Sequence, residues 1–520
     1  MNLRFRPLHC ALLIAAGLPG LAATDARASD VLQAYDLARQ SDPVLAASEA
    51  NRGAQGEGVV QARSALLPQI NGTATLTKSR SNSTSISSFL NNSGGVSFIP
   101  SSSSSDVTSR SYTVNLQQNI YNRANYTQLR ASRSRAEQYD ALYDSAGSAL
   151  IVRVADAYFN VLSAIQDLAS LHAQERSLKR QLDQANVRLQ VGLAPITDAQ
   201  EAKAQYDIAR ATSITAATTL QDAREALTEI TGQPIDHLKG LPADFKPVAP
   251  SPEDVDAWVK SAVDHNPDIH AQQLALDAAN HDIETARAAH LPSIVGSASY
   301  GDRSQWGSST FTRGTDVAGF PATGTNNGPT YSVQLVVPIF SGFAVSSRVR
   351  QAIFNRDAIA DQLEQLRRST IRQTRNYYNS VLAGLSEIEA RKQALLSAQT
   401  AYEATETGLE VGTRTIVDVL ITQQQLFSAQ RYYARARNAF VTNGLHLKQA
   451  AGSITIEDLQ AVNRLLTANA EDALIAPANG DPETMPGLPM RPTSVQPTNA
   501  PTADALPTKP GKKKHKTSKR

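Results

Sequence analysis

The sequence predicts an α+β membrane protein in which each of two repeats joins a pair of β-strands to a long helical hairpin. Three observations support this fold class. One order of segments is written twice, and four stretches of about ten residues alternate apolar and polar side chains. In addition, two runs of nearly 70 residues contain almost no glycine or proline.

The first 28 residues are expected to be a secretory signal peptide. Arg4 and Arg6 precede an apolar run at 10–21, and the small residues at 26–28 form a cleavage site. The only cysteine, Cys10, lies in this segment, so we expect no disulfide in the mature chain. No later stretch has about 18 consecutive apolar residues, and we therefore expect no transmembrane helix.

The charge of the chain excludes one class of partner. The chain carries 50 Lys and Arg against 48 Asp and Glu. The leader removes three bases and one acid, so the charges of the mature chain balance. A balanced chain has no electrostatic footprint for nucleic acid.

The internal duplication sets the domain organisation. "SDPVLAASEA" at 41–50 recurs as "HNPDIHAQQL" at 265–274, and "YTVNLQQNIYN" at 112–122 recurs as "YSVQLVVPIFS" at 331–341. A unit of about 200 residues is longer than a solenoid repeat. The expected boundaries are the first repeat at 29–231, a Pro-rich linker at 232–254, the second repeat at 255–453 and the end of the folded region at 454–470.

Each repeat contains two expected strands, at 68–78 and 111–121 in the first and at 292–301 and 330–340 in the second. Their alternation has a period of two residues, which indicates one apolar face and one wet face. Ten residues suit a tilted strand that crosses a bilayer. The strands alone also fit a soluble two-sheet domain with one solvated face. Between the strands, the polar stretches 78–111 and 301–330 are expected to be flexible external loops.

The rest of each repeat is expected to be helical, at 122–190 and 198–231 and again at 343–410 and 416–450. A helix of roughly 68 residues is about 100 Å long. A rod of this length must pack on its neighbours in the manner of a coiled coil.

Four strands cannot close a barrel in lipid, where an open edge leaves backbone groups without partners. The chain must therefore oligomerise. Two chains supply eight strands, which form a filled barrel, and three supply twelve, which leave room for a wet lumen. The Asn, Thr and Gln residues on one strand face favour the trimer.

Two similar turns join the helices, "LQVGLAPITDAQ" at 189–200 and "LEVGTRTIVDVL" at 409–420. Gly192 and Gly412 follow the last helical residue, where a left-handed conformation favours glycine. The pairs Thr197 with Gln200 and Thr415 with Asp418 have the spacing of a capping box.

Each turn is followed by an acid, Asp198 in the first copy and Asp418 in the second. The residues alone suggest a structural role, because an acid in the first turn of a helix is stabilised by the helix dipole. A functional role for these acids rests on a resemblance to a known family.

The order of helix, strand pair, long helix, V-G-x-x-x-(I/T)-x-D turn and helix, written twice behind a leader, resembles the TolC-like outer membrane factor family of efflux and secretion ducts. The resemblance covers about 30–465 and is most specific at 191–200 and 411–420, with "AQYD" at 204–207. It implies a trimer whose twelve-stranded barrel in the outer membrane is continued by a twelve-helix tunnel in the periplasm. It also implies a periplasmic adaptor and an inner-membrane transporter (RND, ABC or similar) as partners.

The resemblance places the turns at a closed periplasmic tip. It implies that Arg414 belongs to a closing network, that Asp418 forms a constriction ring and that Asp198 is a partner acid. Three converging carboxylates would repel one another and raise the pKa of Asp418. The chain departs from the family pattern at Ile421, in place of a second acid, and at Leu409, in place of a tyrosine. We therefore expect a single acid ring backed by an apolar one, weaker cation selectivity and easier opening.

Other chemistry has little support in the sequence. His265, His270, His281 and His290 lack metal-ligand spacing, and no phosphate loop, nucleophile elbow or CxxC is present, so neither an enzyme nor a cofactor is expected. The tail at 471–520 is Pro- and Thr-rich with a basic end and is expected to be disordered.

Two other protein classes share some of these features. A trimeric coiled-coil adhesin or spacer also has long helices and a barrel, and a periplasmic adaptor has long helices. Strands that interrupt the helices twice favour an export duct, whose cargo is not encoded in these patterns.

Overall fold

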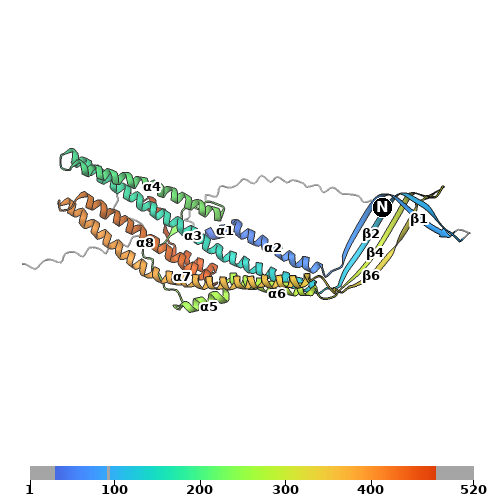
Figure 1. Ribbon diagram of the computed structural model, residues 1–520. Helices are drawn as coiled ribbons and strands as arrows, with labels where there is room; N and C mark the ends of the chain where they lie inside the picture. Colours follow the sequence, from blue (N-terminus) through green and yellow to red (C-terminus); the bar gives the residue numbers. More distant parts are fainter. Residues whose placement is uncertain (1–29, 91–93, 476–520) are drawn as a thin grey trace, which may run out of the picture.

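The computed structural model describes residues 30–90 and 94–475 (Figure 1). The predicted signal peptide and most of the predicted disordered tail lie outside these residues. The helices are α1 (Val31–Ser41), α2 (Pro43–Ser64), α3 (Arg123–Gln190), α4 (Ile196–Thr231), α5 (Val255–His265), α6 (Pro267–Ala288), α7 (Ala344–Glu410), α8 (Ile416–Ala450), α9 (Ile456–Leu465) and α10 (Asp472–Ile475). The strands are β1 (Gln69–Leu90), β2 (Val96–Tyr121), β3 (Lys239–Gly240), β4 (Ser293–Arg313), β5 (Asp316–Pro321), β6 (Gly324–Val336) and β7 (Ala468–Asn469).

The protein is elongated, with a β-sheet at one end and helices that run away from it (Figure 1). The predicted long helices are confirmed: α3 has 68 residues and α7 has 67, which corresponds to about 100 Å each. Both turn back as α4 and α8, and the two hairpin turns lie at the end farthest from the sheet. The same order of two helices, paired strands and a helical hairpin therefore occurs twice.

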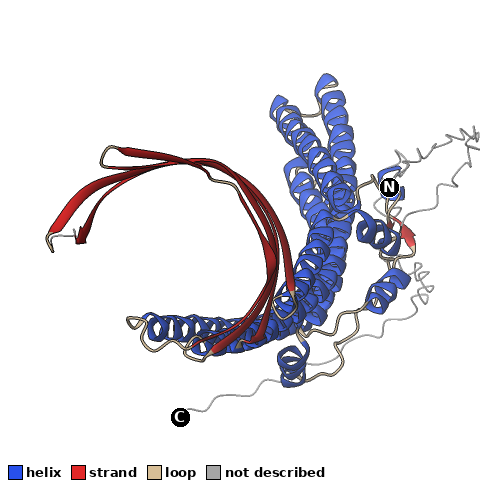
Figure 2. Ribbon diagram, turned by 90° about the vertical axis from the view of Figure 1, so that its right-hand side faces the viewer, coloured by secondary structure: helices blue, strands red, loops and turns tan. Residues whose placement is uncertain are grey.

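The large sheet is antiparallel and has the order β1-β2-β4, with β5 and β6 both paired to β4. In the first hairpin Gln69 pairs with Gln117 and Leu90 pairs with Val96. The sheet curves into an open arc (Figure 2), and among the described residues its outer strands, β1 on one side and β5 and β6 on the other, each pair along one edge only. A curved sheet with two free edges is the form that a protomer of a shared barrel requires.

The prediction of flexible loops between these strands is wrong. β1 has 22 residues and β2 has 26, so the ladder continues through the serine-rich stretch that was expected to be a loop. Ladder hydrogen bonds need only the backbone, and the side chains add cross-strand links. The Oγ atoms of Ser85 and Ser101 lie 2.9 Å apart, and Arg80 binds Asp106 at 2.6 Å. In the second repeat, β4 and β5 likewise occupy most of the expected loop.

The fourth expected strand both begins and ends earlier than predicted, since β6 begins at Gly324 instead of 330. It was expected to reach 340, but β6 ends at Val336. Pro338 explains the early end, because proline has no backbone N–H to donate to a ladder.

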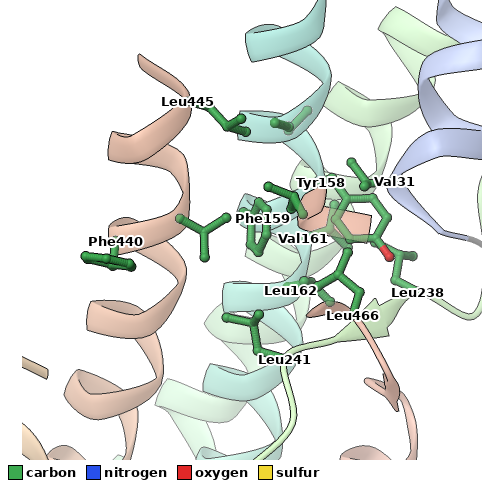
Figure 3. Packing of buried hydrophobic residues seen from close by; sticks show 14 of the residues in the cluster. Val31, Tyr158, Phe159, Val161, Leu162, Leu238, Leu241, Phe440, Leu445 and Leu466 are labelled. Carbon is green, nitrogen blue, oxygen red and sulfur yellow. The ribbon is translucent and has the colours of Figure 1, made fainter. Parts of the chain in front are cut away.

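The stretch 232–254 is packed and is more than a linker. Ile235, Leu238 and Leu241 are buried in the main core, beside Tyr158 of α3 (Figure 3). The Tyr158 hydroxyl donates to the Lys239 carbonyl at 2.8 Å and accepts from the Lys239 N–H at 2.9 Å. The segment that joins the repeats is therefore fixed at the middle of α3.

One described helix, α3, has an apolar window long enough to cross a membrane, which the sequence reading did not anticipate. Within the fold, 61% of this window is buried. Its apolar residues, such as Leu150 and Leu162, belong to the main core and pack against helices of both hairpins.

Candidate functional site: the tips of the two helical hairpins

The two hairpin turns have nearly the same backbone geometry, 220 residues apart. Gly192 and Gly412 have φ angles of 75° and 76°, in the left-handed region predicted for them. The next residue in each turn, Leu193 or Thr413, donates its N–H back to the helix at 2.8 Å. This pairing satisfies carbonyl groups that the end of a helix would otherwise leave without partners.

The second hairpin restarts with the predicted capping box. The Thr415 N–H and hydroxyl donate to Oδ2 of Asp418 at 3.0 and 2.9 Å, and the Asp418 N–H donates to the Thr415 hydroxyl oxygen at 3.3 Å. Both residues thereby fix the first turn of α8.

The capping box predicted for the first hairpin is wrong. α4 begins at Ile196, the residue before it is Pro195, and no side chain caps the helix. Thr197 lies inside the first turn, where its hydroxyl approaches only Asp198, at 3.5 Å. The prediction placed the capping box too far along the chain. The N-cap position is Pro195, whose side chain cannot accept a hydrogen bond.

Within one protomer the pKa of Asp418 is lowered. The main causes are the hydrogen bonds from the backbone and side chain of Thr415, and the charge of Arg414 adds to them. This effect opposes the rise in pKa expected from carboxylates that converge in a trimer. The cap therefore favours the ionised form of Asp418.

Arg414 lies over a glycine at the end of α7. A Cβ atom on Gly408 would lie 2.7 Å from Cγ of Arg414. The Gly408 carbonyl accepts from the N–H groups of Thr413 and Arg414 at 2.8 and 3.1 Å and from the Thr413 hydroxyl at 3.1 Å. Gly408 thus provides the space and an acceptor that hold the start of this turn.

Arg414 is exposed, and among residues 30–90 and 94–475 it has no ion-pair partner within its own protomer. In this same part of the chain no hydrogen bond or ion pair joins Asp198 to Arg414 or Asp418. The structure therefore places the predicted residues at one end of the molecule without linking the two hairpins through them.

Leu409 and Ile421 have different environments. Leu409 is partly buried against the main core and lines a groove of about 590 Å³ with Arg188 and Glu406. Ile421 is 49% exposed on α8. Ile416 packs against apolar clusters that include residues of both hairpins.

The sequence reading missed two groups of residues at this end. Positions 220 residues apart are equivalent in the two hairpins. Before the turn, the first hairpin has Arg188 where the second has Gly408, and after the turn the first has Ala194 where the second has Arg414. The arginine therefore precedes the first turn and follows the second. This exchange is visible in the duplicated sequence.

The second missed group is a buried polar contact between hairpins. Gln423 of α8, which is 2% exposed, donates to Ser177 of α3 at 2.6 Å and lies 3.5 Å from the Tyr402 hydroxyl. Burial raises the pKa of Tyr402 to about 12, and its hydroxyl donates to Glu406 at 3.0 Å. No sequence signal connects these segments.

Comparison with known proteins supports the fold and the function. The profile of the outer membrane efflux protein family matches residues 34–233 and 258–453. The chain is 36% identical over 476 residues to the outer membrane protein TolC of Escherichia coli, which covers 91% of this chain and 90% of that protein. It is 27% identical over 442 residues to the alkaline protease secretion protein AprF of Pseudomonas aeruginosa, covering 84% and 87%.

Solved structures share the fold. The CmeC outer membrane channel of Campylobacter jejuni superposes with a TM-score of 0.64 at 17% identity, covering 90% of this chain and 98% of that one. VceC of Vibrio cholerae superposes with a TM-score of 0.62 at 18% identity, covering 81% and 96%.

These findings confirm the predicted exit duct for efflux and type I secretion, in the outer membrane with a tunnel in the periplasm, and give no support to an adhesin. Channels of this kind are homotrimers that work with adaptor and inner-membrane pump partners. The chain belongs to the outer membrane efflux protein family.

Proposed function

We propose that the six hairpin turns of the trimer form a closed gate at the periplasmic end of the duct, and that Arg414 and Asp418 are its main charged residues. The observation that carries this proposal is the state of Arg414. Its guanidinium is exposed beside Asp418 and has no ion-pair partner within its protomer in the described part of the chain. A charge left without a partner at a protomer edge is suited to pair with an acid of the neighbouring hairpin, for which Asp198 is the candidate.

This gate has a single ring of acids along the tunnel axis, followed by an apolar ring. Asp418 and Ile421 are three residues apart on α8 and therefore lie on one helix face, separated along the axis by about 4.5 Å. In a trimer this spacing stacks three carboxylates on three isoleucine side chains. A single ring of acids attracts cations less strongly than two rings do.

Leu409 gives the gate fewer hydrogen bonds than a tyrosine at the same position would. Its side chain packs against the core and can neither donate nor accept, so it holds α7 by apolar contact alone. We expect this gate to open under a smaller force than one with an additional polar latch.

The partners follow from the family. We propose a periplasmic adaptor and an inner-membrane transporter of the RND, ABC or a similar class, which draw the hairpins apart. Relatives carry names that refer to protease secretion and to efflux, so the cargo is set by the transporter. Passage through such a duct needs no catalytic residue, and the proposal assigns none.

Single-channel recording in planar bilayers tests the gate. Asp418→Asn removes the charge and keeps a carbonyl oxygen that can accept from Thr415, so the helix start remains capped. We expect this variant to lose cation preference, and Asp418→Ala to lose both the preference and the cap. Asp207→Asn, an exposed acid on α4 away from the turn, is the matched control and should behave as wild type.

Two outcomes would overturn the proposal. Unchanged conductance and ion preference in Asp418→Asn would exclude the acid ring. Unchanged conductance in Arg414→Gln would exclude the ionic latch, because loss of a closing ion pair must raise the conductance of the closed tip.

A further inference from the structure

The four junctions between strands and helices are rich in arginine and lack acids. The windows 58–68, 121–136, 285–292 and 337–352 contain eight arginines and neither aspartate nor glutamate. Farther along the strands, bases are mixed with acids. Asp302 and Asp106 lie near the middle of the sheet, and Asp316 lies at its far end. The junctions thus differ in charge from the rest of the sheet.

Five of these arginines are exposed near a helix end that adjoins the sheet. They are Arg63 of α2, Arg130 of α3, Arg287 of α6, and Arg348 and Arg350 of α7, and we name them the junction collar. At 1.5 Å per residue, each lies within about 10 Å of that helix end. The polar headgroup layer has a similar depth on each side of a bilayer.

The collar arginines are not neutralised by the fold. In the described part of one protomer none of the five has an ion-pair partner. Among the nearby acids, Asp282 binds Arg135, and Glu284 lies 3.9 Å from Arg123 and 3.7 Å from His281. Glu57 and Glu137 flank the windows, are exposed and form no ion pair in the described part of the protomer. Five exposed cations near one membrane boundary leave a site for anions.

Apolar side chains lie between the collar and the strands. Phe340 and Phe343 are 77% and 74% exposed and meet edge to face with ring centroids 5.6 Å apart. Phe343 has a φ angle of 63°, which is a strained conformation for a bulky side chain. Leu67 and Leu291 are exposed at the corresponding junctions of β1 and β4. This turn therefore exposes two aromatic rings where the sheet passes into the helices, and membrane barrels carry girdles of aromatic residues at their interfaces.

We propose that the junction collar binds the headgroups of anionic phospholipids in the periplasmic leaflet of the outer membrane. The Phe side chains enter the boundary of the acyl chains, and the arginines reach the phosphates of the same lipids along their flexible stems. Guanidinium groups match phosphate oxygens in geometry as well as charge. The collar thereby fixes the depth of the barrel in the membrane, at the level where the sheet passes into the tunnel.

The purified full-length trimer in nanodiscs tests this proposal. The discs contain equal amounts of dioleoyl phosphatidylglycerol and dioleoyl phosphatidylcholine, and native mass spectrometry counts the lipids that remain bound. We expect wild type to retain phosphatidylglycerol severalfold over phosphatidylcholine. Each collar arginine removed per protomer should lower this preference by up to about fivefold.

The informative variant is Arg348→Gln with Arg350→Gln. Its matched control is Arg367→Gln with Arg372→Gln, two exposed arginines of the same helix that lie roughly 30 Å farther from the membrane. The collar variant should lose most of the preference and the control should keep it. An equal loss in both variants, or no change in the collar variant, would overturn the proposal.

Wild type alone provides a second test that does not depend on the folding of a variant. Contacts between arginine and phosphate near a surface are screened by salt. The preference for phosphatidylglycerol should fall severalfold between 0.1 and 1 M salt during nanodisc assembly. A wild-type trimer that retains both lipids equally at low salt would contradict the proposal directly.

Discussion

Thr415 and Asp418 cap each other at the start of α8, with the Asp418 carboxylate accepting from the Thr415 N–H at 3.0 Å and from its hydroxyl at 2.9 Å. The residue proposed to line the constriction is thus also the residue that fixes the helix behind it. Hydrogen bonds to the charged form lower the pKa of Asp418. A carboxyl group with a lowered pKa stabilises the fold above its ordinary pKa and loses that effect as the pH falls through the lowered value.

The first prediction concerns Thr415→Ala. Loss of the hydroxyl removes one of the hydrogen bonds that hold the pKa of Asp418 low, so the pKa rises. Cation preference in planar bilayers should then be lost at a higher pH in the variant than in wild type. The measurement is a titration of reversal potential under a salt gradient.

Thr413→Ala is the matched control for this experiment. Its hydroxyl donates to the Gly408 carbonyl at 3.1 Å and makes no hydrogen bond to Asp418. The control should titrate as wild type. Identical midpoints for Thr415→Ala and wild type would show that the cap does not govern the charge of Asp418.

The second prediction uses the unequal caps of the two hairpins. Pro195 occupies the position of Thr415 in the first turn, and Asp198 occupies that of Asp418. Pro195→Thr should therefore create the missing capping box, worth about 1 kcal/mol. Amide hydrogen exchange at 196–200 should slow by about fivefold.

Pro195→Ala separates the new cap from the loss of proline. It removes the ring without adding an acceptor, so it should not slow exchange at the same amides. Equal protection in Pro195→Thr and Pro195→Ala would show that no box forms with Asp198.

Local signals made the hairpins predictable. The glycines at 192 and 412 and the long runs without helix breakers marked both turns, and the structure confirms them. The strand lengths were harder to predict, because serine carries no apolar alternation and Ser85 pairs with Ser101 through its backbone and hydroxyl. The packed segment at 232–254 was also missed, since its proline content resembles that of an exposed linker.

The candidate site was predictable only in part. Asp418, Arg414 and the turn glycines came from the duplicated sequence and the family resemblance. The close approach of the Arg414 side chain to Gly408 could not be predicted from the sequence, because it depends on where a side chain lies across a turn. The contact between Ser177 and Gln423 links segments 246 residues apart, and no periodicity fixes the register of one hairpin on the other.

The third prediction concerns this buried contact. Gln423→Ala leaves a cavity and removes the donor to the Ser177 hydroxyl, so we expect a loss of about 2 to 3 kcal/mol in the free energy of unfolding per protomer. Gln423→Met fills the same space, and because Oε1 of Gln423 has no hydrogen-bond partner, this variant should cost less than about 1.5 kcal/mol. Guanidinium unfolding of the detergent-solubilised trimer measures both.

Gln393→Ala is the surface control for the third prediction. This exposed glutamine donates only to Glu389 on the same helix, at 3.1 Å. It should change the free energy by less than about 0.5 kcal/mol. A similar cost for the alanine variants at 393 and 423 would show that the interhelical contact adds nothing to stability.

The fourth prediction tests whether Gly408 positions the latch. Alanine favours a helix over glycine by up to about 1 kcal/mol, so Gly408→Ala should not weaken α7. Its Cβ atom would nevertheless lie 2.7 Å from Cγ of Arg414, and the arginine side chain must move. We expect higher conductance of the closed channel, as in Arg414→Gln, without a lower Tm.

A double-mutant cycle decides whether the two residues act together. If Gly408 acts only by seating Arg414, the double variant should conduct no more than Arg414→Gln alone. Gly444→Ala is the control, because a Cβ atom there meets no atom within 4 Å on α8, and this channel should conduct as wild type. Additive increases in conductance would instead show that Gly408 acts on the turn by a route that does not pass through Arg414.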